Sequence, residues 1–287
     1  MQTFLPFADF RQSADVLDAP RLGKQRVEAL QVLRAIVLPS YGWQSHPAMQ
    51  MWRGYVPALT RYALDMVDAW TDLGHADSTR PLITEFAPAA AVPGATLAMP
   101  SWMGNEALHL SHRSNLVRKA PEFYGPLFPG VADDLPYVWP GPDPVVSEPL
   151  GAVGVDAVDA GMGNSPLMSL VASPMSILRP RNAAEFDEWM LSGTVSMGEQ
   201  SPRGTRGPKW EAQLEAFAAL EPGTPVAVLT VEGNDLVRGT VTGAVMATEE
   251  DGGELILRLP IDFQGELSRQ SFVYPALLQD PRTVFSV

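Results

Sequence analysis

Hydrophobic residues recur at helical spacing in the first part of the chain. Over residues 18–38, leucine and valine recur at roughly helical spacing, which predicts an amphipathic helix with one apolar stripe. Asp18 is placed to act as its N-cap, Pro20 falls in its first turn, and Pro39 ends it. We take this helix as the element around which the first part of the chain is organised.

Two further helices are predicted in the same part. Aromatic and aliphatic residues keep helical spacing over residues 48–73, where Pro57 either kinks the helix or marks its true start. A third helix is predicted over residues 105–119, after the proline- and alanine-rich connector 78–101. We therefore expect residues 1–140 to form a mainly helical domain.

The pattern changes after residue 140. Prolines and glycines punctuate residues 141–165, which predicts a linker. Residues 166–287 predict a smaller α+β domain with a bent antiparallel sheet or partial barrel. Its predicted helices cover residues 183–191 and 210–220, its strands residues 225–231, 236–246, 254–259, 271–274 and 283–287, and its hairpin turns residues 232–235 and 250–253.

Composition narrows the classes of protein to consider. The chain has 287 residues, 46% of them hydrophobic, and seven tryptophans, so we expect a globular protein. The absence of cysteine excludes disulfides, thiolate catalysis and cysteine-ligated metal centres. No apolar run approaches the ~18 residues of a membrane span, and no secretory signal is predicted. We therefore expect an intracellular, cytoplasmic protein that contacts no membrane.

Charge is unevenly distributed along the chain. The net charge of −13 argues against a general attraction to nucleic acid. Residues 1–140, however, carry 11 Lys and Arg against 13 Asp and Glu, whereas residues 141–287 carry 9 against 20. Cations cluster over residues 21–26 and 113–119, which predicts a local basic groove in the first domain. The alternative is an acidic surface that only keeps the protein soluble.

One face of the first helix combines both signs of charge. Arg21, Lys24, Gln25 and Glu28 fall at i, i+3, i+4 and i+7, so they share about two turns of one face. A carboxylate flanked by cations on a rigid helix is a candidate for proton transfer or charge stabilisation. The alternative is a solvated face with a Lys24–Glu28 ion pair of a few tenths of a kcal/mol.

Histidines raise a separate hypothesis, a metal-dependent hydrolase. It would need His46, in a loop rich in stacking and hydrogen-bonding groups, to meet His109 and His112 of the third helix. The spacing Glu106-x2-His109-x2-His112 points the last ring about 120° away from Glu106, which is poor geometry for a zinc site. We expect no metal and no cofactor.

Three blocks of sequence, taken in order, carry a resemblance to a known family. They are Arg21-Leu-Gly-Lys-Gln-Arg-Val-Glu28, then His46-Pro with Met51-Trp-Arg-Gly54, Leu59, Arg61 and Gly74, and then Asn105 to Lys119 followed by Pro121 and Tyr124. Through them residues 1–130 resemble the pyrimidine-dimer DNA glycosylases of the phage endonuclease V type, and more closely their bacterial relatives of unassigned function.

The resemblance implies a helical endonuclease V-like fold and a chemistry. In that family an amine attacks C1′ of the damaged nucleotide, expels the base and forms a Schiff base, and elimination then nicks the strand. The family's glutamate matches Glu28. Damaged or modified duplex DNA is the implied partner of residues 1–130. The implied DNA contacts are Arg21, Arg26, His46, Arg53, His109, Arg113 and Lys119.

Gln2 departs from the family pattern. The phage enzymes have a small second residue, so that Met is removed and the exposed α-amine is the nucleophile. The bulk of Gln2 would leave Met1 in place. The nucleophile is then the Met1 amine, or Lys24 activated by burial and neighbouring cations, or water. The alternative to a glycosylase with AP-lyase activity is a non-catalytic nucleic-acid or protein binding module. The acidic C-terminal domain would select substrate or dock a protein partner.

Overall fold

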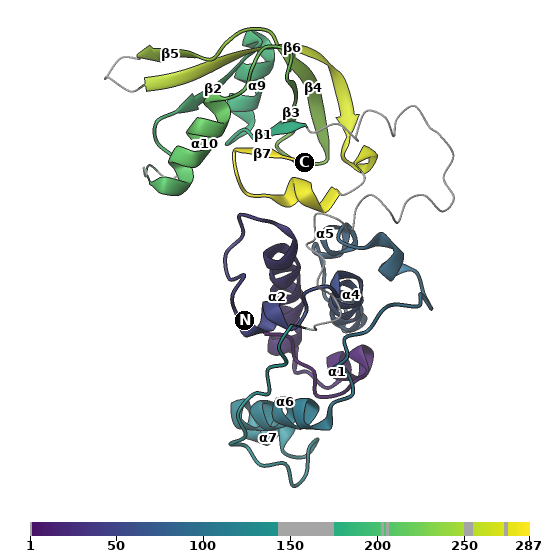
Figure 1. The fold of residues 1–287 in the computed structure, drawn as a ribbon. Coiled ribbons are helices and arrows are strands. Elements are labelled where there is room, and N and C mark those ends of the chain that lie inside the picture. The colour runs from purple at the N-terminus through teal and green to yellow at the C-terminus, as the bar shows by residue number, and fades with distance from the viewer. Residues whose placement is uncertain (1, 143–174, 202–203, 205–206, 250–254, 273–274) are drawn as a thin grey trace. The chain divides into compact units, whose positions relative to one another are not determined.

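The computed structural model describes residues 2–142, 175–201, 204, 207–249, 255–272 and 275–287. The chain divides into two compact units, Met1–Asp159 (unit 1) and Ala160–Val287 (unit 2), and each is described by itself (Figure 1). The predicted linker 141–165 lies outside the described residues, except for residues 141 and 142. No helix among the described residues is both long and apolar enough to cross a bilayer.

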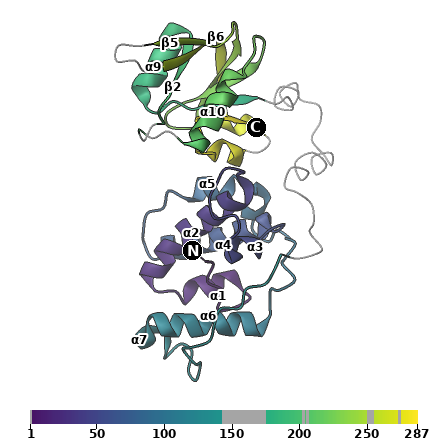
Figure 2. The same cartoon turned by 60° about the vertical axis from the view of Figure 1, so that its left-hand side comes forward.

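Unit 1 is helical, as predicted. Its elements are α1 (Phe10–Asp15), α2 (Ala19–Val37), α3 (Pro47–Gln50), α4 (Val56–Asp72), α5 (Arg80–Thr84), the 3-10 turn η1 (Pro88–Ala91), α6 (Glu106–Lys119) and α7 (Pro121–Tyr124). The long helices α2 and α4 pack against each other, α1 packs on α4, and α6 lies across one end of the unit (Figure 2).

Local signals set the ends of the first long helix. The Asp18 carboxylate accepts a hydrogen bond from the backbone N–H of Arg21, and Pro20 occupies the first turn of α2. The predicted helix 48–73 is instead two helices, α3 and α4. Gly54 has φ of +83° in the turn between them, a conformation that favours glycine, and Pro57 lies in the first turn of α4. The proline therefore marks a true start and not a kink.

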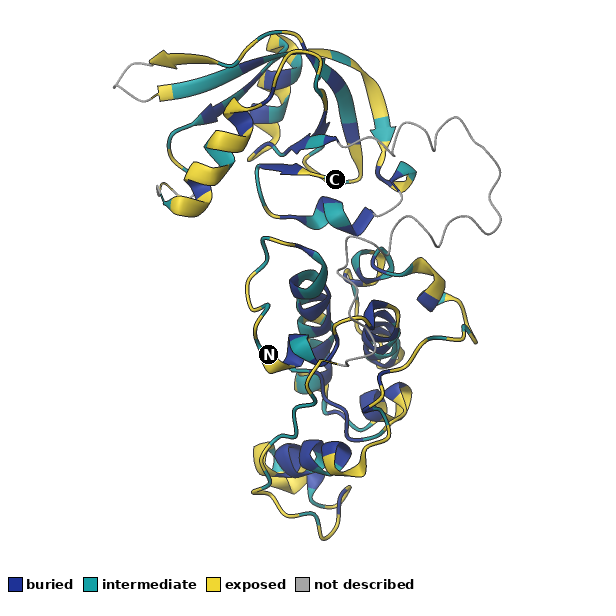
Figure 3. Cartoon of the chain, in the orientation of Figure 1, coloured by how far each residue is buried: buried dark blue, intermediate teal, exposed yellow. Residues whose placement is uncertain are grey.

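The core of unit 1 is rich in aromatic side chains. Trp52 and Tyr62 are fully buried, and their rings contact those of Phe10 and Trp102 at centroid distances of 5.0–6.1 Å. Buried positions lie on the facing sides of α2 and α4 (Figure 3). This core fixes α2, which carries the candidate catalytic face, as a rigid support.

Unit 2 is an α+β fold with a curled sheet, which confirms the predicted fold class. Its helices are α9 (Ala183–Ser192) and α10 (Pro208–Ala218), with 3-10 turns η2 (Arg269–Ser271) and η3 (Pro275–Gln279). Its strands are β1 (Ser176–Leu178), β2 (Thr194–Gly198), β3 (Pro225–Leu229), β4 (Asp235–Val241), β5 (Met246–Glu249), β6 (Leu255–Ser268) and β7 (Val284–Ser286). The order is β2-β6-β4-β3-β1-β7, with β5 also paired to β6.

The sheet is mixed and bends along its longest strand. β1 pairs parallel with β3, and the other pairings are antiparallel. β6 pairs with β2 and β5 through its first half and with β4 through its second half, and the register of β4 shifts between Arg238 and Gly239. A Cβ at Gly239 would lie 2.5 Å from the Ile261 side chain and 3.0 Å from the Asp262 carbonyl oxygen, so this position of β4 has no room for a side chain.

Several boundaries in unit 2 differ from the sequence prediction. β1 and β2 were not predicted, and β6 continues well beyond the predicted residues 254–259. The predicted strand 271–274 is wrong over its described part, because Ser271 ends the turn η2. Its residues 273–274 and the predicted hairpin turn 250–253 lie outside the described residues.

Candidate active site

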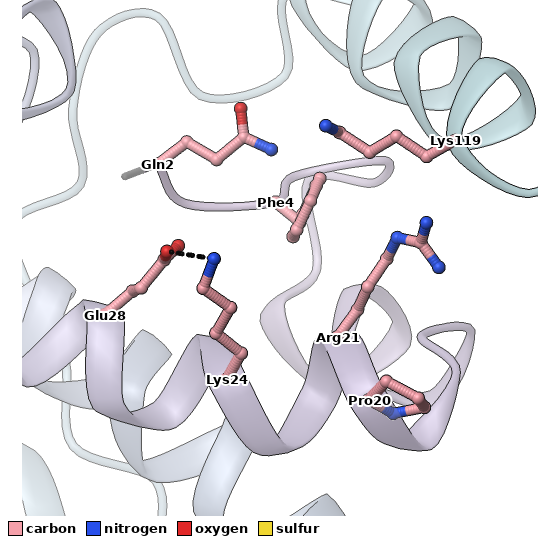
Figure 4. Close-up of a pocket in the computed structure, with 7 residues that line it drawn as sticks. All are labelled: Gln2, Phe4, Pro20, Arg21, Lys24, Glu28 and Lys119. Carbon is pink, nitrogen blue, oxygen red and sulfur yellow. Dashed lines mark ion pairs between the residues drawn. The ribbon is translucent and has the colours of Figure 1, made fainter.

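A polar hollow of about 450 Å³ opens on unit 1 beside α2. Its lining comes from the N-terminal segment, from α2 and from the last residue of α6 (Figure 4). The lining residues are Gln2, Phe4, Pro20, Arg21, Lys24, Glu28 and Lys119. Three cations and one carboxylate thus share one surface of a protein with a net charge of −13.

Glu28 and Lys24 form an ion pair on the floor of the hollow. Lys24 Nζ lies 3.2 Å from Glu28 Oε1, and both side chains rise from α2 (Figure 4). The Glu28 side chain is only 13% exposed, whereas that of Lys24 is 74% exposed. The expectation that burial activates Lys24 therefore does not hold in the free protein, although an amine and a shielded carboxylate do lie together.

Arg21 and Lys119 supply positive charge on the other side of the hollow. Arg21 forms an ion pair with Asp18, and its guanidinium lies 5.4 Å from the centroid of the Tyr124 ring. Tyr124 is buried, and its hydroxyl accepts a hydrogen bond from the Asp18 N–H at 3.0 Å. Burial raises the pKa of Tyr124. Lys119 is exposed and points from α6 toward Gln2 (Figure 4), so it is free to meet an anion.

Gln25 anchors the N-terminal segment over α2. It is 1% exposed, its Nε2 donates to the Gln2 carbonyl at 2.8 Å, and its Oε1 accepts from the Phe4 N–H at 3.3 Å. Both ends of one buried amide thus bind the backbone that forms the wall of the hollow. Sequence reasoning placed Gln25 on the right helix face but assigned it no role.

Four more side chains bind successive residues of the same segment. The contacts are Trp52 Nε1 to Thr3 Oγ1 at 2.9 Å, the Tyr62 hydroxyl to Phe4 O at 2.9 Å, His109 Nδ1 to Leu5 O at 2.8 Å, and Arg113 Nη1 to Pro6 O at 2.9 Å. His109 Nε2 accepts from the Gly104 N–H at 3.1 Å, so Nδ1 carries the proton donated to Leu5. Residues 2–6 are therefore held in one conformation.

The structure brings together only part of the predicted site. Arg21, Lys24, Glu28 and Lys119 line the hollow, and Met1 lies outside the described residues. The remaining predicted DNA contacts lie elsewhere. His109, buried at 3% exposure, and Arg113 hold the N-terminal segment.

Arg26, Arg53 and His46 also lie outside the lining. Arg26 forms an ion pair with Asp77 at 2.5 Å, and its guanidinium lies 5.2 Å from the Trp70 ring centroid. Arg53 is exposed and donates to the Gln44 carbonyl at 3.2 Å. His46 caps α3 by accepting a hydrogen bond from a backbone N–H.

The histidines do not assemble into a metal site. His112 is fully buried, and neither of its ring nitrogens has a hydrogen-bond partner among the described residues. Burial lowers its pKa from 6.5 to about 3. Within the described ranges of the chain, no group of three or more His, Asp or Glu side chains is placed to hold a metal ion. The hydrolase hypothesis requires three histidine rings around one metal ion, and the described residues do not provide that arrangement.

Comparison with known protein families gives a match over the first part of the chain. A family model described as pyrimidine dimer DNA glycosylase matches residues 1–81. No curated protein and no solved structure matches the chain. The matched segment includes α1 to α4 and every residue of the hollow except Lys119. The family resemblance is thereby confirmed for this segment.

Proposed function

Because residues 1–81 belong to the pyrimidine dimer DNA glycosylase family, we propose that the hollow beside α2 is the active site of a DNA glycosylase. The reaction is excision of a damaged or modified base, followed by AP-lyase cleavage where an amine of the protein is the nucleophile. The observation that carries the proposal is the convergence of Glu28, Lys24 and Gln2 on one hollow lined by cations.

In this proposal Glu28 stabilises the positive charge that develops during the reaction. As the bond between C1′ and the base weakens, positive charge develops on the sugar, and a carboxylate beside it lowers the barrier. At 13% exposure Glu28 is shielded from water, which strengthens its interaction with that charge. A base within a duplex is out of reach, so the nucleotide must leave the stack, and this costs least at damaged positions.

The amine completes the reaction. Its nitrogen gives up a proton and bonds to C1′ as the base departs, and the base takes up a proton as it leaves. The C1′–O4′ bond of the sugar ring then breaks and O4′ takes up a proton, which leaves a protonated imine between the amine nitrogen and C1′. The resulting imine allows a proton to leave C2′ and the C3′–O bond to break, which nicks the strand, and water then releases the protein. Lys24 lies 3.2 Å from Glu28 and is one candidate for this amine. The α-amine of Met1 is the other, because the buried Gln25 holds the adjoining residue at the edge of the hollow.

Arg21 and Lys119 bind phosphates in this proposal. Their charges flank the hollow from two different helices, and phosphate contacts fix the position of a strand without reading its sequence. Their local excess of positive charge offsets the acidic character of the whole protein at this surface.

A binding module without catalysis is the second candidate. The observation that favours it is the high exposure of Lys24 at 74%, because an exposed i,i+4 ion pair is common on helix surfaces. On this hypothesis the hollow binds DNA but breaks no bond.

Base release and strand nicking separate the two candidates. The protein is incubated with duplexes that carry pyrimidine dimers, and separately with duplexes that carry an abasic site. Glu28→Gln keeps the shape of the side chain and removes its charge, so we expect base release to fall by about 10²–10⁴. Asp15→Asn, which removes the exposed Arg11 ion pair on α1, is the matched control and keeps wild-type activity.

Either of two results would contradict the glycosylase proposal. One is DNA binding by the wild type without base release or nicking on any damaged duplex, which supports the binding module. The other is full activity of Glu28→Gln.

A further inference from the structure

We propose that an aromatic stripe next to the hollow stacks on bases of the DNA strand bound there. The stripe consists of Trp43, His46, Tyr137 and Trp139, all in unit 1. It deepens the proposed function and rests on it, because it names the part of the substrate that this surface binds. The sequence singled out the loop of residues 40–47 for its stacking groups, and the hollow does not use them.

Trp43 is held out from the protein. Its side chain is 62% exposed, and its backbone has φ of +72°. Among the described residues it is the only one other than glycine with positive φ. L-residues with bulky side chains rarely adopt this conformation, and strain of this kind gathers at functional sites. A bulky side chain that is exposed by an unfavourable backbone conformation is therefore a candidate contact for a ligand.

The rings form a continuous series that leads to the hollow. Trp43 lies 5.9 Å from His46, His46 lies 6.0 Å from Trp139, and Trp139 lies 5.3 Å from Tyr137, measured between ring centroids. On its other side the Tyr137 ring lies 5.2 Å from that of the buried His112 on α6, and Lys119, the last residue of this helix, lines the hollow. The series of rings therefore runs from the exposed Trp43 to the helix that supplies Lys119 to the hollow.

The inner end of the stripe is fixed on α6. The Leu135 N–H donates to Ser114 Oγ at 3.1 Å, and the Val138 N–H donates to Ser111 Oγ at 3.1 Å. Asn115 Nδ2 donates to the Leu135 carbonyl at 3.1 Å. The extended backbone at residues 135–139 is thus tied down through the helix, which presents its two aromatic rings without further ordering on binding.

His46 adds a directed donor between two tryptophans. Its Nδ1 accepts from the Ala48 N–H at 3.1 Å, so in this hydrogen bond the ring proton is on Nε2. That donor has no partner among the described residues and is available to a base edge or a phosphate oxygen.

The cations around the stripe and the hollow favour a nucleic acid over an apolar protein as the partner. The exposed Arg53 borders the loop through its hydrogen bond to Gln44, and the cations Arg21, Lys24 and Lys119 lie at the hollow. An apolar peptide would cover the rings but bring no anion to the exposed Arg53 and Lys119. A nucleic-acid strand brings a phosphate with every base, so it satisfies both surfaces.

The proposal is tested by measuring the affinity for a duplex with a non-cleavable abasic analogue. Fluorescence anisotropy gives this affinity over a range of salt concentrations. Trp43→Ala should weaken binding by about five- to a hundred-fold, the range for loss of one base–aromatic stack. Trp43→Phe should keep most of the wild-type affinity. Leu73→Ala, which removes another exposed apolar side chain of unit 1, is the matched control.

Two further readouts separate stacking from a structural role. Trp43→Ala should leave the slope of log K against log salt unchanged, whereas Lys119→Ala should reduce it, because only the lysine displaces counterions. A duplex that lacks the bases flanking the lesion but keeps their phosphates should bind the wild type more weakly. The same change should not weaken DNA binding by Trp43→Ala.

The stacking proposal would be overturned if base removal and Trp43→Ala weakened DNA binding additively. It would also be overturned if Trp43→Ala weakened binding no more than Leu73→Ala does. In either case, base release by the wild type would leave the glycosylase proposal standing. A wild type that binds no DNA would overturn both proposals.

Discussion

Gln25 connects the chemistry of the hollow to the packing beneath it. Because the amide is buried and binds both Gln2 and Phe4, its loss frees the start of the chain while leaving α2 in place. Tyr62 makes a comparable buried hydrogen bond, but to the Phe4 carbonyl and not to Gln2. The two residues therefore offer a matched pair of variants.

We predict that Gln25→Leu lowers lyase turnover more than Tyr62→Phe does at an equal loss of stability. Each variant removes buried hydrogen bonds and should cost about 1–3 kcal/mol in the free energy of unfolding. Only Gln25→Leu releases Gln2, so only it should lower kcat with little change in KM. Urea unfolding and nicking kinetics measure the two effects. Equal losses of turnover in both variants would show that Gln25 is only structural.

Gly23 illustrates a residue whose identity is set by a neighbouring element. Alanine is normally better than glycine inside a helix by about 1 kcal/mol. Here a Cβ would lie 2.8 Å and 2.9 Å from the Cζ3 and Cη2 atoms of Trp70 on α4. The Trp70 ring cannot easily retreat, because it stacks on His75 at 3.9 Å and its Nε1 donates to the Ala76 carbonyl at 3.0 Å.

At the scale of elements, we predict that Gly23→Ala destabilises the contact between α2 and α4. Overpacking of this kind costs about 1–3 kcal/mol, which outweighs the gain in helix propensity. Chemical unfolding of Gly23→Ala, Trp70→Leu and the double variant measures the coupling. The double variant should recover much of the loss caused by Gly23→Ala. A Gly23→Ala protein as stable as the wild type would contradict this packing argument.

The buried His112 of α6 predicts a pH dependence of stability. Its pKa in the folded protein is about 3, because burial disfavours the charged ring, against 6.5 for an ordinary histidine. Below pH 6.5 the unfolded chain therefore binds the proton first, and stability falls by up to about 1.4 kcal/mol per pH unit until the folded pKa is reached. Above pH 6.5 the ring makes no such contribution.

We predict that His112→Leu is close to neutral near pH 7 and flattens the acid side of the stability profile. An apolar side chain leaves no unpaired ring nitrogens, which removes a desolvation cost. Urea unfolding at about pH 7 and about pH 5 measures the slope. His75→Gln changes an exposed histidine and should keep the wild-type slope. A His112→Leu profile as steep as that of the wild type would contradict the assignment.

Elements bounded by local signals could be predicted, and those that depend on distant partners could not. Asp18, Pro20 and Pro39 act within a few residues, so α2 was predicted at nearly its true length. Gln25 and His109 bind residues 2–5, up to 104 positions away in the sequence, and nothing in their own surroundings shows this. The strand β1 has three residues, and its pairing with β3 is what defines it.

At the scale of the whole molecule, compactness separates the two units, whereas the net negative charge is divided almost equally between them. Residues 160–287 carry 9 Lys and Arg against 16 Asp and Glu, a net charge of −7, and the remaining residues carry a net charge of −6. The hollow and the aromatic stripe lie entirely within Met1–Asp159. The chemistry proposed for this protein therefore needs only unit 1.

We predict that residues 1–159 alone fold and retain activity on damaged DNA. Removing a net charge of −7 should strengthen DNA binding at low salt, and this gain should fade as salt screens the interaction. Circular dichroism, nicking assays and a salt series on the fragment measure these effects. A fragment that folds but has lost activity would show that unit 2 contributes to the reaction.

The most direct test of the glycosylase proposal is to locate a covalent intermediate. Borohydride reduction in the presence of abasic DNA traps a Schiff base, and peptide mapping then identifies the residue that carries the sugar. The proposal predicts an adduct on Lys24 or on the Met1 amine, with its formation slowed in Glu28→Gln. An adduct on a residue remote from the hollow, or nicking that produces no adduct, would contradict an amine mechanism at this site.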